Sequence, residues 1–130
     1  MSSLKIGLGQ MLVEGGKLEE NFARARVKVE EAAQNGCQIL MLPECLDVGW
    51  THPSSKEIAV PIPGTTSDVL CYEAKEHEIH VVAGITERYG NSIYNAAILI
   101  SPEGKILHKH RKITTLGIEQ HLRKPLILAW

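Results

Sequence analysis

The spacing of apolar residues predicts a strand, a helix and a strand in the first third of the chain. Residues 4–11 alternate between apolar and other side chains, as in a strand with one buried face. From residue 17 to residue 35 the apolar side chains recur every three or four positions, which predicts an amphipathic helix that ends at Gly36. The unbroken apolar run 39–42 predicts a strand buried on both faces. This order of elements indicates a parallel βαβ unit.

The rest of the chain predicts a second helix and three further strands. A loop rich in Gly, Pro, Ser and Thr spans residues 44–63, and a helix is predicted to begin near Thr65, with Asp68 as its capping residue. The predicted strands are 79–85, 93–100 and 105–113. The turn sequence Ser-Pro-Glu-Gly at 101–104 predicts that the last two strands form a hairpin.

These elements together predict an α/β chain with a mixed sheet and helices on one face. A sheet of such apolar strands needs cover on its other face as well. Helices from a further part of the polypeptide, or a partner subunit, are the candidates for that cover.

Composition and charge narrow the classes of function. The 130 residues, 44% hydrophobic and 22% charged, are typical of one globular domain. The net charge of −1, with Lys and Arg scattered along the chain, argues against nucleic acid and anionic membranes as partners. The first apolar stretch, 6–12, is too short for a signal peptide, and we expect no membrane span. Three cysteines without a CxxC pair predict free thiols and a cytoplasmic location.

Three segments resemble a known family. The first, 42–50, reads Leu-Pro-Glu-Cys-Leu-Asp-Val-Gly-Trp and follows the second predicted strand. The second, 94–106, covers most of the predicted hairpin, and the third, 110–113, reads His-Arg-Lys-Ile at the end of the returning strand. In this order and spacing they resemble the nitrilase superfamily of carbon–nitrogen hydrolases. The first segment is similar to the one that carries the family's catalytic glutamate, and the third to the one that carries its lysine.

The resemblance extends from about residue 5 to residue 122. We therefore assign residues 1–122 to the N-terminal part of a carbon–nitrogen hydrolase domain and 123–130 to a divergent C-terminal tail. The resemblance implies a partial αββα (nitrilase-like) sandwich. It also implies hydrolysis or condensation of non-peptide C–N bonds in amides, nitriles or carbamoyl compounds by a Glu–Lys–Cys triad, without a metal or other cofactor. By this resemblance, Glu44 and Lys112 are the catalytic residues.

Acyl transfer from an amide asks for residues of these types. It needs a nucleophile, a base that deprotonates the nucleophile, and positive charge where the oxyanion develops. A carboxylate at the end of a buried strand, as expected of Glu44, is desolvated and suited to act as the base. The ammonium group of Lys112 would stabilise the oxyanion. Both residues follow predicted strands, and sites of open α/β sheets lie just beyond strand ends.

Alternation along the last predicted strand separates Lys112 from its charged neighbours. Even-numbered residues from Ile106 to Lys112 lie on one predicted face, and odd-numbered residues, including Arg111, on the other. His108 and His110 form an HxH pair on the face of Lys112. Because no third ligand is evident, we interpret this pair as a polar strand face and not as a metal site.

Two further residues of these segments are candidates for a role in the site or the sheet. Trp50 is a candidate for lining a substrate pocket beside Glu44, and a packed loop aromatic is an equally good interpretation. Asn95 is expected to satisfy a hydrogen-bond need inside the sheet and not to act in catalysis.

The positions of the cysteines limit what this chain can do. Cys37 precedes a predicted buried strand, Cys71 lies within the second helix, and Cys45 is expected to point away from its neighbour Glu44. In the family the nucleophile follows the lysine, and here no cysteine follows Lys112. We therefore expect a fragment or truncated form of a hydrolase, inactive by itself, whose small-molecule amide or nitrile substrate belongs to the full-length parent.

Two alternatives remain open from the sequence. One is a non-catalytic truncated subunit that binds a full-length homologue, in addition to the possibility of a homo-oligomer. The other is an unrelated α/β binding module whose motifs match by chance, which predicts no pocket joining Glu44 to Lys112.

Overall fold

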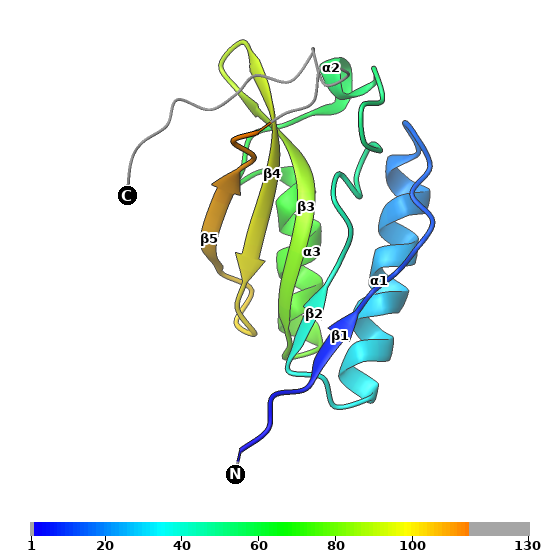
Figure 1. The fold of residues 1–130 in the computed structure, drawn as a ribbon, viewed down its shortest axis with the longest axis vertical. Helices are drawn as coiled ribbons and strands as arrows, with labels where there is room; N and C mark the ends of the chain where they lie inside the picture. The colour runs from blue at the N-terminus through cyan, green and yellow to red at the C-terminus, as the bar shows by residue number, and fades with distance from the viewer. Residues whose placement is uncertain (1, 115–130) are drawn as a thin grey trace.

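The computed structural model describes residues 2–114, which form a five-stranded sheet with its long helices on one side (Figure 1). The strands, in their order across the sheet, are β1 (Ile6–Leu8), β2 (Ile39–Met41), β3 (His80–Tyr89), β4 (Ser92–Ile100) and β5 (Ile106–Arg111). The helices are α1 (Leu18–Gln34), α2 (Ser55–Ile58) and α3 (Thr65–Glu76). The first three strands pair in parallel and the last three antiparallel, which confirms the mixed α/β sheet. The expected tail at 123–130 lies outside the described residues.

Helix α1 forms where the apolar spacing predicts it. One side of the helix is buried, and its apolar members recur every three or four positions: Phe22, Ala25, Val29 and Ala32. The helix ends in a left-handed residue, Gly36, with φ of 72°. The N–H of Gly36 donates to Ala33 O and that of Cys37 to Ala32 O, both at 2.9 Å, so that the last carbonyl groups are satisfied.

Helix α3 is capped by a different residue from the one expected. Gly64 N–H donates to Ser67 Oγ at 3.0 Å, and Ser67 Oγ donates to Gly64 O at 2.9 Å. The predicted capping residue, Asp68, is exposed. The prediction was wrong by one position because Gly64, and not Thr65, is the residue that flanks the helix, which puts the reciprocal contact on Ser67.

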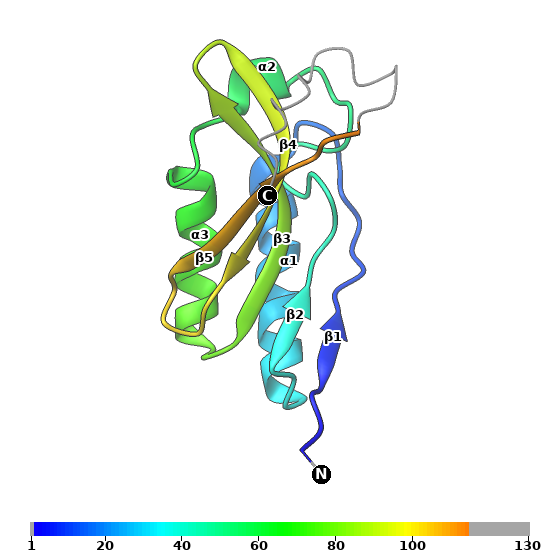
Figure 2. The same ribbon diagram turned by 60° about the vertical axis from the view of Figure 1, so that its left-hand side comes forward.

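The two faces of the sheet differ in their cover. In both views α1 and α3 lie on the same side of the sheet (Figures 1 and 2). Leu40 of β2 faces the helices and is 2% exposed, whereas its neighbour Met41 faces the other way and is 44% exposed. The prediction that run 39–42 is buried on both faces is therefore wrong for the described chain, because its helices cover one face only. Ile6 and Leu8 of β1 are exposed in the same way.

The directions of the strands bring two distant segments to one edge of the sheet. β2 and β3 are parallel, β4 runs against β3, and β5 runs against β4. β5 therefore points the same way as β2, and the residues that follow these two strands emerge at the same edge. This arrangement places the chain after Met41 and the chain after Arg111 on either side of β3 and β4.

Candidate active site

A tight turn that leans over β3 presents Glu44. The chain after β2 stays hydrogen-bonded to β3: Leu42 N–H donates to Val82 O, Gly84 N–H to Pro43 O, and Leu46 N–H to Gly84 O. Cys45 has a positive φ of 46°, a conformation uncommon outside glycine, which turns the chain directly after Glu44. The turn thereby carries Glu44 from the edge of β2 over β3.

Gly84 of β3 is the residue on which this turn rests. A Cβ atom at this position would lie 2.5 Å from Glu44 Cα and 2.9 Å from Pro43 O. Both atoms belong to the backbone, so no side-chain rotation could relieve the overlap. The turn can approach β3 this closely only because residue 84 has no side chain.

We expect Gly84→Ala to lift the Glu44 turn from β3 and to destabilise the fold by roughly 1–3 kcal/mol. The matched control is Gly7→Ala in β1, where an added Cβ would meet only side-chain atoms, the nearest at 3.3 Å. Equilibrium urea unfolding of both variants measures the difference in the free energy of unfolding. Equal stability of the two variants would contradict the close approach described here.

Lys112 follows β5 on the sheet face that the helices leave open. Its backbone N–H donates to Asn95 O at 2.8 Å, which extends the pairing of β4 with β5 by one residue. The predicted alternation is correct for His108 and His110, which pair with residues of the open face, and wrong for Ile106. The register shifts between Leu99 and Ile100, so an extra residue in β5 turns Ile106 toward the helices, where it packs against the core.

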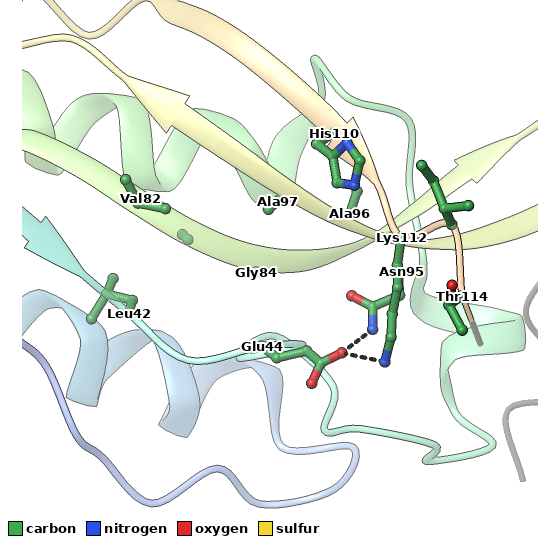
Figure 3. A pocket seen from close by; sticks show the side chains of 12 residues that line it. Leu42, Glu44, Val82, Gly84, Asn95, Ala96, Ala97, His110, Lys112 and Thr114 are labelled. Atoms are coloured by element: carbon green, nitrogen blue, oxygen red, sulfur yellow. Dashed lines mark hydrogen bonds and ion pairs between the residues drawn. The ribbon is translucent and has the colours of Figure 1, made fainter. Parts of the chain in front are cut away.

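Glu44 and Lys112 meet at the open face (Figure 3). Lys112 Nζ lies 3.0 Å from Glu44 Oε1, although the two residues are 68 positions apart in the chain. The predicted proximity is confirmed, whereas the catalytic roles stay predictions. The expected desolvation of Glu44 is absent from the described chain: its side chain is 49% exposed and that of Lys112 is 32% exposed. The reason is again the open face, which leaves the end of β2 without cover.

The pair lines an open cavity of about 360 Å³. Its floor is formed by small and apolar residues of three strands and the chain beside them. Its lining residues are Leu42, Glu44, Val82, Ala83, Gly84, Asn95, Ala96, Ala97, His110, Lys112, Ile113 and Thr114. A carboxylate and an ammonium group thus border a space large enough for a small organic molecule.

Asn95 of β4 is a member of the site that the sequence did not indicate. Its side chain is buried, at 5% exposure, and its Nδ2 donates a hydrogen bond to Glu44 Oε1 (Figure 3). In the sequence Asn95 is one polar residue in an apolar strand, which is compatible with any buried hydrogen bond. Only the position of Glu44 above the sheet defines its partner.

Asp47 anchors the far end of the same turn. Its Oδ2 accepts hydrogen bonds from Thr86 N–H at 2.9 Å and from Thr86 Oγ1 at 2.6 Å. Burial raises the pKa of Asp47, against the opposing effect of the hydrogen bonds from Thr86. Asn21 of α1 donates to the backbone oxygen of Asp47 at 3.0 Å, so the turn is held from the helix as well.

The other charged residues of β5 lie on the helix side of the sheet. Lys109 Nζ and Arg111 Nε contact the buried carboxylate of Glu87 at 2.5 Å and 2.6 Å. The Arg111 guanidinium also stacks between the rings of Tyr89 and Tyr94, 4.5 Å and 4.4 Å from their centroids. The predicted separation of Lys112 from Arg111 is thus confirmed: Arg111 lies on the helix side, and Lys112, directly after β5, faces Glu44.

The remaining candidates do not line the cavity. Trp50 is further along the loop and is not among the lining residues of the cavity that the structure describes. The same holds for Cys37, Cys45 and Cys71. Cys45 is buried beside Glu44 in a turn, and not in extended chain as expected, yet it does not line the cavity.

Residues 2–114 contain neither a cluster of metal-binding side chains nor a membrane-spanning helix. Within this range no group of three His, Cys, Asp or Glu side chains is arranged to hold a metal ion. None of the helices in this range is long and apolar enough to cross a bilayer.

Curated relatives match most of this chain. Omega-amidase NIT2-A of Xenopus laevis is 38% identical over 120 residues, which are 92% of this chain and 43% of the amidase. A nitrilase of Pyrococcus abyssi is 31% identical over 126 residues, which are 94% of this chain and 48% of the nitrilase. The chain therefore spans less than half the length of these relatives.

Solved structures share the fold. An amidase from Nesterenkonia sp. superposes with a TM-score of 0.85 at 18% identity, covering 98% of this chain and 51% of the amidase. A mutant of the amidase from Nesterenkonia sp. AN1, in which acrylamide has added to the active-site cysteine, superposes with a TM-score of 0.85 at 16% identity, covering 98% of this chain and 54% of that one. The model of the carbon–nitrogen hydrolase family matches residues 5–126, and the chain belongs to that family.

Proposed function

We propose that this chain supplies the base and the ammonium group of a site that hydrolyses a non-peptide C–N bond in a small amide. The observation that carries the proposal is the contact of 3.0 Å between Lys112 Nζ and Glu44 Oε1 at the edge of a cavity. Among amides, nitriles and carbamoyl compounds we favour amides, because several relatives at 33–38% identity are named omega-amidases.

In the proposed reaction a cysteine thiol gives its proton to Glu44, and the thiolate attacks the amide carbon. The oxyanion that forms is stabilised by the ammonium group of Lys112. Glu44 then returns the proton to the leaving nitrogen, so the C–N bond breaks and a thioester remains. A water molecule, deprotonated by Glu44, attacks the thioester, which releases the carboxylic acid and restores the thiol.

The thiol of this reaction is proposed to come from outside these 130 residues. None of the three cysteines lines the cavity around Glu44 in the described part of the chain. The Nesterenkonia amidase, whose chain is about twice as long as the matched region, has an active-site cysteine. We accordingly expect the 130-residue polypeptide to have no amidase turnover by itself.

A chimera tests this proposal. Residues 5–114 would replace the matching segment of the Xenopus laevis omega-amidase, and release of ammonia from a panel of small primary amides would be measured. We expect turnover from the chimera and none from the 130-residue polypeptide, because only the chimera contains the nucleophile. A chimera whose nucleophilic cysteine is replaced by alanine is the control, and it should be inactive.

The alternative function is association with a full-length homologue. The exposed apolar side chains of the open sheet face, Ile6, Leu8 and Met41, favour some protein cover of that face. In our proposal the segment that carries the cysteine provides it. A folded but inactive chimera, together with copurification of the 130-residue chain with the full-length amidase, would favour the association instead.

A further inference from the structure

Strand β4 contributes one side chain to the contact between Glu44 and Lys112, and that side chain is Asn95. The carboxylate and the ammonium group come from the chain beyond β2 and beyond β5, with β3 and β4 between them. Neighbouring strands are about 4.8 Å apart, so the two functional groups must reach toward each other across the sheet. Asn95 stands between them, on the same face.

The hydrogen bonds on Glu44 are distributed unevenly over its two oxygens. In the described part of the chain, Asn95 Nδ2 and Lys112 Nζ both donate to Oε1. An ionised carboxylate has acceptor sites on both oxygens, and a base needs one of them for the incoming proton. With Oε1 holding both donors, Oε2 is the oxygen that can accept a proton from the nucleophile.

The backbone of Asn95 binds the other residue of the pair, Lys112. Its carbonyl oxygen accepts the N–H of Lys112 at 2.8 Å, one residue beyond the end of β5. The same residue therefore fixes the backbone of Lys112 and the carboxylate of Glu44. A flexible lysine and a half-exposed glutamate lose much side-chain freedom when they form an ion pair, and pairs at exposed positions contribute little by themselves.

Asn95 is itself held in place from the opposite strand. It lies directly across from Thr86 in the register of β3 and β4. Thr86 is bonded to the buried Asp47 through both its N–H and its hydroxyl group. Asn95 is 5% exposed, so its side chain has little room to rotate and its amide stays directed at Glu44.

From these contacts we propose that Asn95 is a positioning residue, which orients the Glu44 carboxylate so that Oε1 binds Lys112 and Oε2 accepts the proton. This inference rests on the proposed function for its purpose, but not for its geometry. The alternative is that Asn95 has a structural role only, in which Glu44 merely accepts the hydrogen bond that the buried Asn95 amide requires. In that case Glu44 would keep its contact with Lys112 when the Asn95 amide is removed.

The test measures the contact between Glu44 and Lys112 in the full 130-residue chain by NMR. In protein labelled with ¹⁵N and ¹³C, the ammonium signal of Lys112 and its coupling across the hydrogen bond to the Glu44 carboxyl carbon report how often the pair is formed. Because a hydrogen bond to a charged group is lost, we expect Asn95→Ala to lower the population of the pair about tenfold. We expect Asn95→Leu, which keeps nearly the same size and shape but has no donor, to do the same.

The control is Asn91→Ala, the same chemical change in the exposed turn between β3 and β4. It should leave the Lys112 signal unchanged. The backbone N–H signal of Thr86 shows in every variant whether the neighbouring strand is intact, and Asn95→Leu serves if Asn95→Ala does not fold. A Lys112–Glu44 coupling that persists in a folded Asn95 variant overturns the proposal.

The NMR test of Asn95 and the chimera test of the proposed function can fail independently of each other. Loss of the pair in the Asn95 variants, together with an inactive chimera, would support the positioning role and refute the amidase function. Persistence of the pair, together with an active chimera, would refute the positioning role alone.

Discussion

Glu44→Gln in the active chimera is expected to lower kcat/KM for amide hydrolysis about 10²- to 10⁴-fold, the usual contribution of a general base. Gln has nearly the same size as Glu and can still accept a hydrogen bond from Asn95 or Lys112 through its carbonyl oxygen. It cannot take a proton from the thiol. Initial rates of ammonia release measure the effect, and Glu57→Gln, at an exposed carboxylate of α2, is the matched control.

A second substitution shows whether Glu44 and Lys112 act together. Lys112→Met removes the ammonium group, and the double variant Glu44→Gln/Lys112→Met should lose little more activity than the more damaging single change. Residues that act as one unit give such non-additive losses. Full activity of Glu44→Gln, or strictly multiplicative losses in the double variant, would contradict the reaction proposed for this site.

Glu87→Ala is expected to destabilise the chain by roughly 3–5 kcal/mol, the usual cost of breaking a buried ion pair from one side. Glu87 is 1% exposed and accepts hydrogen bonds from Lys109 and Arg111, so its removal leaves two cations near the core without their carboxylate. Urea unfolding of the 130-residue chain measures the loss. Glu57→Ala is again the control, and a Glu87→Ala variant as stable as that control would show that the buried pair contributes nothing.

The same carboxylate gives the stability of the chain a defined pH dependence. Burial acts to raise the pKa of Glu87, but the hydrogen bonds from Arg111 and Lys109 outweigh it, and the pKa is lowered from the usual 4.5. Its stabilising contribution is therefore complete above pH 4.5 and is lost as the pH falls through the lowered pKa of the folded chain. The difference in the free energy of unfolding between wild type and Glu87→Ala should accordingly shrink below pH 4.5.

Asp47 gives the stability the opposite pH dependence, and its effect must be separated from that of Glu87. Its pKa is raised from 3.8, so its contribution is complete below that pH and is lost as the pH rises through the raised pKa. Wild type and Glu87→Ala both contain Asp47. Its contribution therefore cancels in the difference between their free energies of unfolding.

Local patterns in the sequence predicted most of the elements. The three- and four-residue spacing of apolar side chains identified α1, because one side of a helix recurs with that period whatever it packs against. The turn at 101–104 identified the β4–β5 hairpin, since proline and glycine restrict the turn itself. The register within that hairpin was not accessible, because the bulge that turns Ile106 toward the helices depends on how the two strands pack.

By itself the sequence determined the elements other than the short helix α2, which lies where a loop was predicted, together with their order and the two residue types of the site. These depend on neighbours in the chain and on motifs that can be read there. Tertiary structure decided what meets across the sheet. It placed the Glu44 turn on Gly84, gave Asn95 its partner and left one face of the sheet open. These outcomes depend on distances between atoms far apart in the chain, which no local pattern encodes.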